Sequence, residues 1–266
     1  MNPEENYLDT NRDSWNKRTV AHFDSDFYNL NGFLKGESSL NEIELEFLGD
    51  IKGKSILHLQ CHFGQDTISL ARMGAIVTGV DLSDVAIEKA KELALETNCS
   101  ANFICSDIYD LPKALNAKFD MVFTSYGTIG WLPDINKWAE VVSHFLKPNG
   151  QFLIAEFHPV VWMFDDNFEK IKHRYFNSEP ISETEEGAYA NKEAAITTSN
   201  ITWNHGLAEV ATALIGQNIK IEAFREYDYS PYDCFSNTYE FEPRKFRIKA
   251  FEDKVPMVYA MLGRKD

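Results

Sequence analysis

The sequence predicts an α/β fold with a doubly wound, mostly parallel β-sheet. Apolar runs of strand length, rich in β-branched and aromatic residues, alternate along the chain with amphipathic stretches of helical length. Strands separated by helices require right-handed crossovers, which place helices on both faces of one sheet. The chain has 266 residues, which is long enough to bury a substantial core.

Five apolar runs are the expected strands of this sheet. They cover residues 55–60, 75–81, 101–107, 119–125 and 151–157. Residues 82–98 follow the second run and predict a helix, with Ser83 as its N-cap and with small and apolar side chains on one face. Residues 133–150 predict the helix before the fifth run, and their final Pro-Asn-Gly is a stop signal.

The segment before the first strand is expected to be a helix that docks on the domain. Residues 8–23 place Trp15, Val20 and Phe23 as an apolar set, and Thr10 is the candidate cap. The simplest interpretation is a packed amphipathic helix with Trp15 in the core.

Composition narrows the classes of function. The formal charge of -15, from 41 acidic and 26 basic side chains, disfavours nucleic acid and anionic lipid as partners. The sequence has no apolar run long enough to cross a bilayer and no signal-peptide pattern, so we expect no membrane insertion and a cytoplasmic location. The four cysteines are scattered, which favours reduced thiols.

Acidic residues stand at the carboxyl ends of two successive strands, where ligands bind in sheets of this kind. Asp81 ends the second strand and can accept both hydroxyls of a ribose. Asp107 ends the third strand and can accept a hydrogen bond from an adenine amine. Either residue alone could be a helix cap or a solvated turn residue, but together they favour a cofactor site.

The turn after the first strand departs from the usual glycine-rich pattern. Gln60 and His62 stand where two of three glycines are expected, and His58 replaces an acidic residue. Because these side chains adopt positive φ less freely than glycine, we expect the loop to differ in detail. A zinc site built from His58, Cys61 and His62 is the alternative. Structural zinc needs four ligands, normally from two clusters, and the second cluster is missing, so we expect no metal.

Several segments together resemble class I S-adenosylmethionine-dependent methyltransferases. The similarity is spread over most of the chain and implies a Rossmann-like fold, S-adenosylmethionine as cofactor, and a closing antiparallel pair formed by residues 219–230 and 256–265. It is closest to the small-molecule branch around quinone-biosynthesis C-methylases, and to a bacterial subgroup with HLQCHFGQDT. The segments are "GKSILHLQCHFGQDTISLARMGAIVTGVDLSDVAIEKAKELA", "FICSDIYDLP", "FDMVFTSYGTIGWLPD", "FLKPNGQFLIAEFHP" and "VPMVYAMLGRKD".

The resemblance also implies a set of cofactor-binding residues. The turn of Gln60, Cys61, His62 and Gly64 would line the methionine part, and Asp81 would hold the ribose. Leu82, Asp107 and Ile108 would surround the adenine. Ser125 and Tyr126 would flank the methionine and the transferred methyl group. The usual role of the strand-one acid is not carried over to His58. The amino-terminal segment of similar enzymes closes over the cofactor.

The sulfonium of such a cofactor is already activated, so the protein must chiefly align the acceptor and remove a proton. His158 follows the fifth strand and is the first candidate base, because it should face the same crevice and titrates near neutrality. Tyr126, Glu156 and His205 are the other catalytic candidates. A histidine bonded to backbone at the strand end is the alternative for His158. The "TSYG" after strand four and the acidic charge favour a small-molecule acceptor.

We expect one methyltransferase domain over residues 1–266, with a homodimer as a further option. Its parts are a helical cover (1–50), a cofactor-binding core (51–159), a lid, acceptor flap or dimer contact (160–200), and a helix with closing strands (201–266). Two other classes compete. A nicotinamide-dependent oxidoreductase would not explain Asp107 with the terminal strand pair, and a non-catalytic binding or regulatory protein would lack a closed acceptor pocket.

Overall fold

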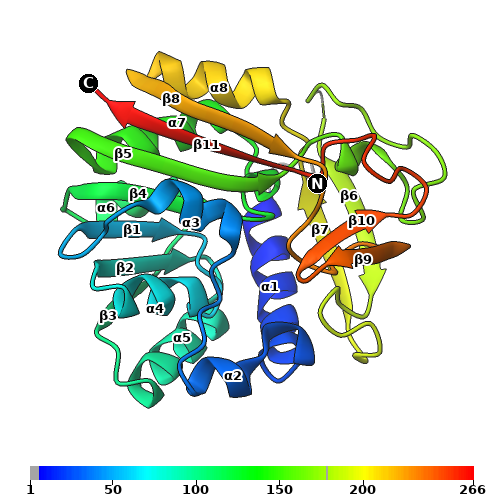
Figure 1. Ribbon diagram of the computed structural model, residues 1–266, viewed down its shortest axis with the longest axis horizontal. Coiled ribbons are helices and arrows are strands. Elements are labelled where there is room, and N and C mark those ends of the chain that lie inside the picture. The colour runs from blue at the N-terminus through cyan, green and yellow to red at the C-terminus, as the bar shows by residue number, and fades with distance from the viewer. Residues whose placement is uncertain (1–5, 178) are drawn as a thin grey trace.

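The computed structural model describes residues 6–177 and 179–266, and these have the predicted α/β fold (Figure 1). The central sheet has seven strands in the order β3-β2-β1-β4-β5-β11-β8. The first five pair in parallel, and β11 is antiparallel to both β5 and β8, so the terminal antiparallel pair is confirmed. The strands are β1 (Ser55–Leu59), β2 (Ile76–Asp81), β3 (Ala101–Cys105), β4 (Phe119–Ser125), β5 (Leu146–Phe157), β8 (Ile219–Tyr227) and β11 (Val258–Lys265).

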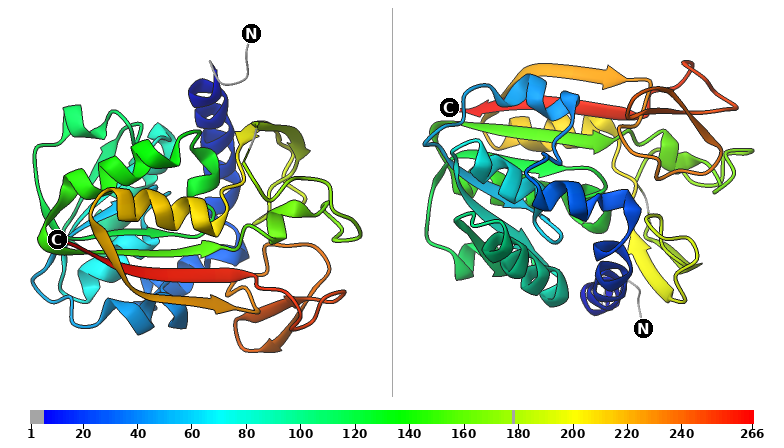
Figure 2. Two further views of the ribbon diagram at one scale, coloured as in Figure 1. Left: turned by 90° about the horizontal axis from the view of Figure 1, so that it is seen from above. Right: turned by 60° about the horizontal axis from the view of Figure 1, so that its bottom comes forward.

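Helices cover both faces of this sheet (Figure 2). Helices α7 and α8 pack on one face, and α3, α4 and α5 pack on the other. None of the helices in the described part of the chain is long and apolar enough to span a membrane. The helices of the core are α3 (Glu42–Leu48), α4 (Gln65–Arg72), α5 (Asp84–Glu96), α6 (Leu111–Ala114), α7 (Ile135–Phe145) and α8 (Leu207–Gly216).

Strand β1 shows how the sequence pattern fixes the two faces. Leu57 and Leu59 point into the cluster beneath α7 and α8, whereas Ile56 points into the cluster beneath α3 and α4. Successive side chains of a strand alternate between faces, so an apolar run buries both sides at once. This is why mostly apolar runs predicted the central strands.

The starts of α5 and α7 are capped by side chains. The hydroxyl of Ser83 accepts a hydrogen bond from the backbone N–H of Ala86 at 3.0 Å, as predicted. Asp134 caps α7 by accepting from the backbone N–H groups of Asn136 and Lys137 at 3.0 and 3.1 Å. These caps pair backbone donors that a helix leaves free at its start.

The amino-terminal helix α1 (Tyr7–Phe23) differs from the prediction. It begins before Thr10 and Val20 is 66% exposed, so the proposed cap and the place of Val20 on the apolar side are wrong. The buried residues share one helical face and are polar: Asn11, Ser14, Arg18, Thr19 and His22. The physical reason is that α1 packs chiefly against β7 (Thr197–Thr202) and the cavity wall, and only its end, at Phe23, packs against an apolar cluster.

Two hairpins extend beyond the same end of the sheet, and one of them, β6–β7, lies beside α1 (Figure 1). The segment predicted as an insertion contains β6 (Ile181–Glu186) antiparallel to β7, which continues past residue 200 and moves the expected boundary. A second hairpin, β9 (Thr238–Glu242) with β10 (Lys245–Ile248), lies between β8 and β11 and was not predicted. Short helices connect the remaining parts: η2 (Asp26–Tyr28), α2 (Leu30–Leu34), η3 (Ile129–Trp131) and η4 (Val161–Met163).

Candidate functional site

A cavity of about 1160 Å³ lies at the carboxyl ends of the parallel strands. Its wall includes the turn after β1, the ends of β2 to β5, helix α1 and residues of both hairpins. The structure brings together at this cavity all but one of the residues singled out from the sequence: Gln60, Cys61, His62, Gly64, Asp81, Leu82, Asp107, Ile108, Ser125, Tyr126, Glu156 and His205.

The turn after β1 has positive φ at all three positions of the glycine pattern, although only Gly64 is a glycine. Gln60, His62 and Gly64 have φ values of 55°, 51° and 80°. Gln60 and His62 therefore adopt the positive φ that side chains other than glycine reach less freely. A non-glycine residue in this left-handed region costs about 1–2 kcal/mol, so contacts elsewhere must hold the turn. Strain of this kind gathers at ligand sites.

Asp81 supplies one of those contacts. Its carboxylate accepts hydrogen bonds from the backbone N–H of His62 at 2.8 Å and from that of Ser83 at 2.9 Å. Burial raises the pKa of Asp81 to about 6. The residue thus joins the turn after β1 to the start of α5, and each carboxylate oxygen retains a second lone pair for a ligand.

Gln60 links the same turn to the loop after β4. Its Nε2 donates to the carbonyl of Thr128 at 2.7 Å. Its Oε1 is buried and has no hydrogen-bond partner in residues 6–177 and 179–266. A buried acceptor without a partner is costly, so this oxygen fits a donor supplied by a bound molecule.

Glu156, at the end of β5, holds the loop after β4. Its carboxylate accepts from the backbone N–H groups of Gly127, Thr128 and Ile129, the last two at 2.7 and 3.2 Å, and from the Thr128 hydroxyl at 2.8 Å. Tyr126, which precedes this loop, has a φ of 44°. These contacts favour a positioning role for Glu156 over its predicted role as a base.

The hydroxyl of Tyr126 reaches a carboxylate that the sequence analysis missed. It donates to Oε2 of Glu44 at 2.6 Å, and Oε1 of Glu44 accepts from the backbone N–H of Asn41 at 2.7 Å. Glu44 is fully buried, and burial, reinforced by the charge of Asp66, raises its pKa to about 7. The Asn-x-x-Glu capping box at the start of α3 was the available signal.

His158 does not face the cavity, so its expected orientation was wrong. Its Nε2 lies 2.9 Å from Oε1 of Glu226 on β8, and its Nδ1 accepts from the backbone N–H of Val160 at 3.2 Å. The reason is that the chain stays paired with β11 beyond β5, through the His158 N–H and the Met257 carbonyl at 2.8 Å, which aims the ring at the far edge of the sheet.

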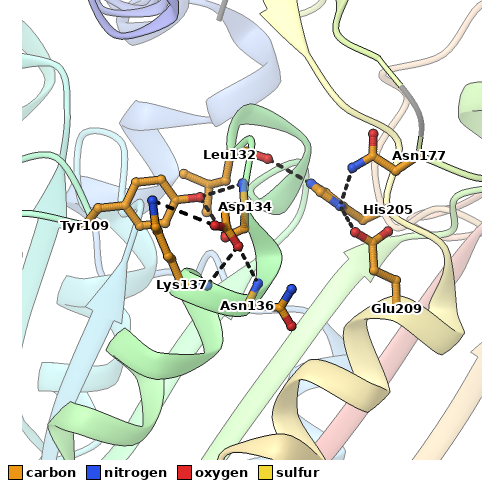
Figure 3. Close-up of polar contacts among 8 residues, drawn as sticks. All are labelled: Tyr109, Leu132, Asp134, Asn136, Lys137, Asn177, His205 and Glu209. Atoms are coloured by element: carbon orange, nitrogen blue, oxygen red, sulfur yellow. Dashed lines mark hydrogen bonds and ion pairs between the residues drawn. The ribbon is translucent and has the colours of Figure 1, made fainter.

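His205 lies in the cavity wall but has both ring nitrogens occupied (Figure 3). Its Nε2 donates to the Leu132 carbonyl at 2.8 Å, and its Nδ1 lies 3.1 Å from Oε1 of Glu209 and 3.4 Å from Nδ2 of Asn177. The ring thereby ties the segment before α7 to α8. We expect it to hold this wall in place and not to act as a base.

His58, Cys61 and His62 were the three side chains considered for a zinc site. In the structure they point to different partners. Nδ1 of His58 lies 2.8 Å from the Thr67 hydroxyl, and the sulfur of Cys61 contacts the backbone. The ring of His62 faces α1, 5.3 Å from the ring of Trp15 between centroids. Across the described ranges, no group of three or more His, Cys, Asp or Glu side chains could hold a metal ion.

The polar face of α1 forms part of the wall and was also missed. Asn11 exchanges two hydrogen bonds with the backbone of Ile201, at 2.8 and 2.9 Å. Arg18 forms an ion pair with Glu185 of β6 at 2.8 Å. Polar residues repeating three and four positions apart were the signal in the sequence. Helix α1 and the β6–β7 hairpin therefore form one hydrogen-bonded cover.

A family model described as a methyltransferase domain matches residues 56–150. A ubiquinone biosynthesis O-methyltransferase of Coxiella burnetii is 30% identical over 161 residues, which are 58% of this chain and 65% of that protein. An uncharacterized methyltransferase of Synechocystis is 33% identical over 48% of this chain and 59% of its own length. The chain thus spans less than two thirds of these relatives.

Solved structures agree with the fold. A putative S-adenosylmethionine-dependent methyltransferase of Listeria monocytogenes has a TM-score of 0.56 and 17% identity, covering 84% of this chain and 95% of that one. A geranyl diphosphate C-methyltransferase of Streptomyces coelicolor, solved with S-adenosyl-L-homocysteine, has a TM-score of 0.55 and 14% identity, covering 84% and 76%. At these identities the likeness establishes the architecture.

Proposed function

We propose that this protein transfers the methyl group of S-adenosylmethionine to a small-molecule acceptor. The observation that carries the proposal is the turn of residues 60–64, which keeps positive φ at three positions and is fixed by Asp81 beside the cavity. A strained turn at the end of the first strand provides close backbone approach to a ligand. The methyltransferase-domain match includes this turn, and the named O-methyltransferase relative supports the same reaction.

The residues at the cavity fit the parts of this cofactor. Asp81 would accept the ribose hydroxyls and Asp107 the adenine amine, with Leu82 and Ile108 beside the adenine. The buried Oε1 of Gln60 would accept from the amino-acid part. Cys61, His62 and Gly64 would complete the turn, and Ser125 and Tyr126 would flank the methionine. When bound, the cofactor supplies a methyl group activated by its sulfonium.

The cavity leaves room for an acceptor beside the cofactor. Its volume of about 1160 Å³ exceeds the roughly 300–1,000 Å³ of an ordinary small-ligand site. Four aromatic side chains in the cavity wall provide apolar surface for it: Phe157, Trp162, Tyr232 and Phe235. We infer an acceptor with an apolar or aromatic body. The acidic net charge of the chain independently disfavours nucleic acid as the acceptor.

Tyr126 and Glu44 are the groups best placed to receive a proton from the acceptor. Tyr126 lines the cavity, and its hydroxyl is bonded to Glu44. Burial raises the pKa of Tyr126 well above 10, so the phenol stays protonated and would pass a proton on to Glu44 as it takes one up. Methyl transfer would then leave the methylated acceptor, S-adenosylhomocysteine and a proton on the carboxyl group.

Calorimetry with S-adenosylmethionine and S-adenosylhomocysteine tests the cofactor assignment. Asp81→Ala should weaken both affinities at least tenfold, because charge-assisted hydrogen bonds to two hydroxyls are worth about 1.5–3 kcal/mol. Asp50→Ala is the matched control, since Asp50 is exposed and outside the cavity. Unchanged affinity in a folded Asp81→Ala protein would contradict the assignment.

The competing functions give different results in the same samples. An oxidoreductase would bind NADH and not S-adenosylmethionine. A non-catalytic binding protein would bind S-adenosylmethionine but transfer no label in a screen of small-molecule acceptors with cofactor labelled at the methyl group.

A further inference from the structure

Asp66, in the first turn of α4, is a cavity residue to which the proposed function gives no task. Its Oδ1 accepts from the Ser39 hydroxyl at 2.6 Å and its Oδ2 from the Ser125 hydroxyl at 3.1 Å. Both donors are neutral, and no lysine, arginine or histidine of the described chain forms an ion pair with this carboxylate. Two hydroxyl groups thus hold an uncompensated negative charge in the wall.

The end of β1 carries His58 and does not provide a negative charge. His58 is buried, its Nδ1 lies against the Thr67 hydroxyl, and burial lowers its pKa to about 4. The imidazole is therefore neutral at physiological pH. A cation bound near the ends of β1 and β4 would find its anionic partner in Asp66.

The order of the strands says which part of a ligand Asp66 would meet. Neighbouring strands run β3, β2, β1, β4, and the carboxylates of Asp107, Asp81 and Asp66 lie at the end of β3, at the end of β2 and against the end of β4. A cofactor with its adenine at Asp107 and its ribose at Asp81 would continue past the turn after β1 toward Ser125. Its amino-acid end would then lie at Asp66.

We propose that Asp66 binds the ammonium group of the cofactor's methionine part, assisted by the free Oε1 of Gln60. This inference rests on the proposed function. The carboxylate would supply a charge-assisted acceptor and Gln60 a neutral one, which matches the three N–H donors of an ammonium group. Ser39 and Ser125 would be positioning residues that fix the carboxylate. A purely structural Asp66, serving only these two hydroxyls, is the alternative.

Titration calorimetry with two ligands separates these roles. The ligands are S-adenosylhomocysteine and its desamino analogue, which keeps the carboxylate and lacks only the amino group. Each is titrated into wild type, Asp66→Asn and the control Asp13→Asn, which removes an exposed carboxylate of α1 that is outside the cavity.

Wild type should bind the desamino analogue about tenfold or more weakly than S-adenosylhomocysteine. Asp66→Asn should weaken S-adenosylhomocysteine by about ten- to a hundredfold and change the analogue less than about threefold. The control should match wild type for both ligands. This interaction between variant and ligand belongs to an ammonium contact, because a general distortion of the wall would weaken both ligands alike.

Equal losses for the two ligands in Asp66→Asn, or no loss for either, would overturn the proposal. If that variant does not fold, wild type alone decides: equal affinities for the two ligands also overturn it. Failure of the proposed function looks different, since wild type would then bind neither ligand.

Discussion

The central sheet with its helices and the cover of this molecule are held together by different interactions. In the core, β1 and its neighbours bury leucine, isoleucine and phenylalanine on both faces of the sheet. In the cover, α1 buries a polar face, and Asn11 and Arg18 bond to the β6–β7 hairpin. Apolar burial is non-directional, whereas buried hydrogen bonds demand fixed geometry. The difference indicates that the cover holds its polar groups at defined positions.

The largest effect should come from Glu44, the fully buried carboxylate of α3. Its pKa rises from 4.5 to about 7 on folding, so the folded protein holds the proton more tightly than the unfolded chain. Stability should therefore fall as pH rises from 4.5 through 7, and the raised pKa corresponds to about 3 kcal/mol. Glu44→Gln should match wild type at pH 4 and be more stable by up to that amount at pH 8.

Denaturant unfolding of both proteins across this pH range makes the measurement. Glu42→Gln, on the exposed side of the same helix, is the control and should follow wild type. A pH-independent difference between Glu44→Gln and wild type would show that this carboxyl group titrates alike in the folded and unfolded states.

An intermediate effect is expected for Asn11→Ala. The change leaves the buried N–H and carbonyl of Ile201 without partners, which should cost about 1–3 kcal/mol. The loss should be local, so hydrogen exchange should speed up in β7 while the central strands keep their protection. Asn31→Ala, at an exposed position, is the control. Equal acceleration in β1 and β7 would mean that the cover and the core unfold as one unit.

The smallest effect on ligand binding and chemistry should come from His158→Ala. Because the ring lies outside the cavity and pairs with Glu226, affinity for S-adenosylhomocysteine and the rate of methyl transfer should stay within about twofold. Stability should fall by about 1 kcal/mol through the lost hydrogen bonds. A loss of methyl transfer of a hundredfold or more, with binding intact, would restore His158 as a base.

Local patterns predicted the core and failed for the cover, for physical reasons visible in single residues. Ser83 caps the helix that it precedes, and Asp81 ends the strand that contains it, so each role can be read within a few residues. Asn11 has its partner 190 positions away, and only that partner explains why a polar face is buried. No local pattern reports such a contact.

The positive φ values in the turn after β1 could not be predicted for the same reason. Its strain at Gln60 and His62 is offset by Asp81, a residue of the next strand. The hairpin β9–β10 is different, because Tyr239 and Phe241 alternate on one side of its turn and Phe246 and Ile248 on the other. That alternation was available in the sequence.

The buried polar face of α1 also affects how the chain behaves during its synthesis on the ribosome. Its partners in β7 leave the ribosome about 190 residues later, which at roughly 5–20 residues per second is a delay of about 10–40 seconds. An amphipathic helix would expose an apolar stripe to the cell throughout that interval. The docking face of α1 is polar instead, so before β7 is made this face can stay hydrated without exposing an apolar stripe. It consists of Asn11, Ser14, Arg18, Thr19 and His22.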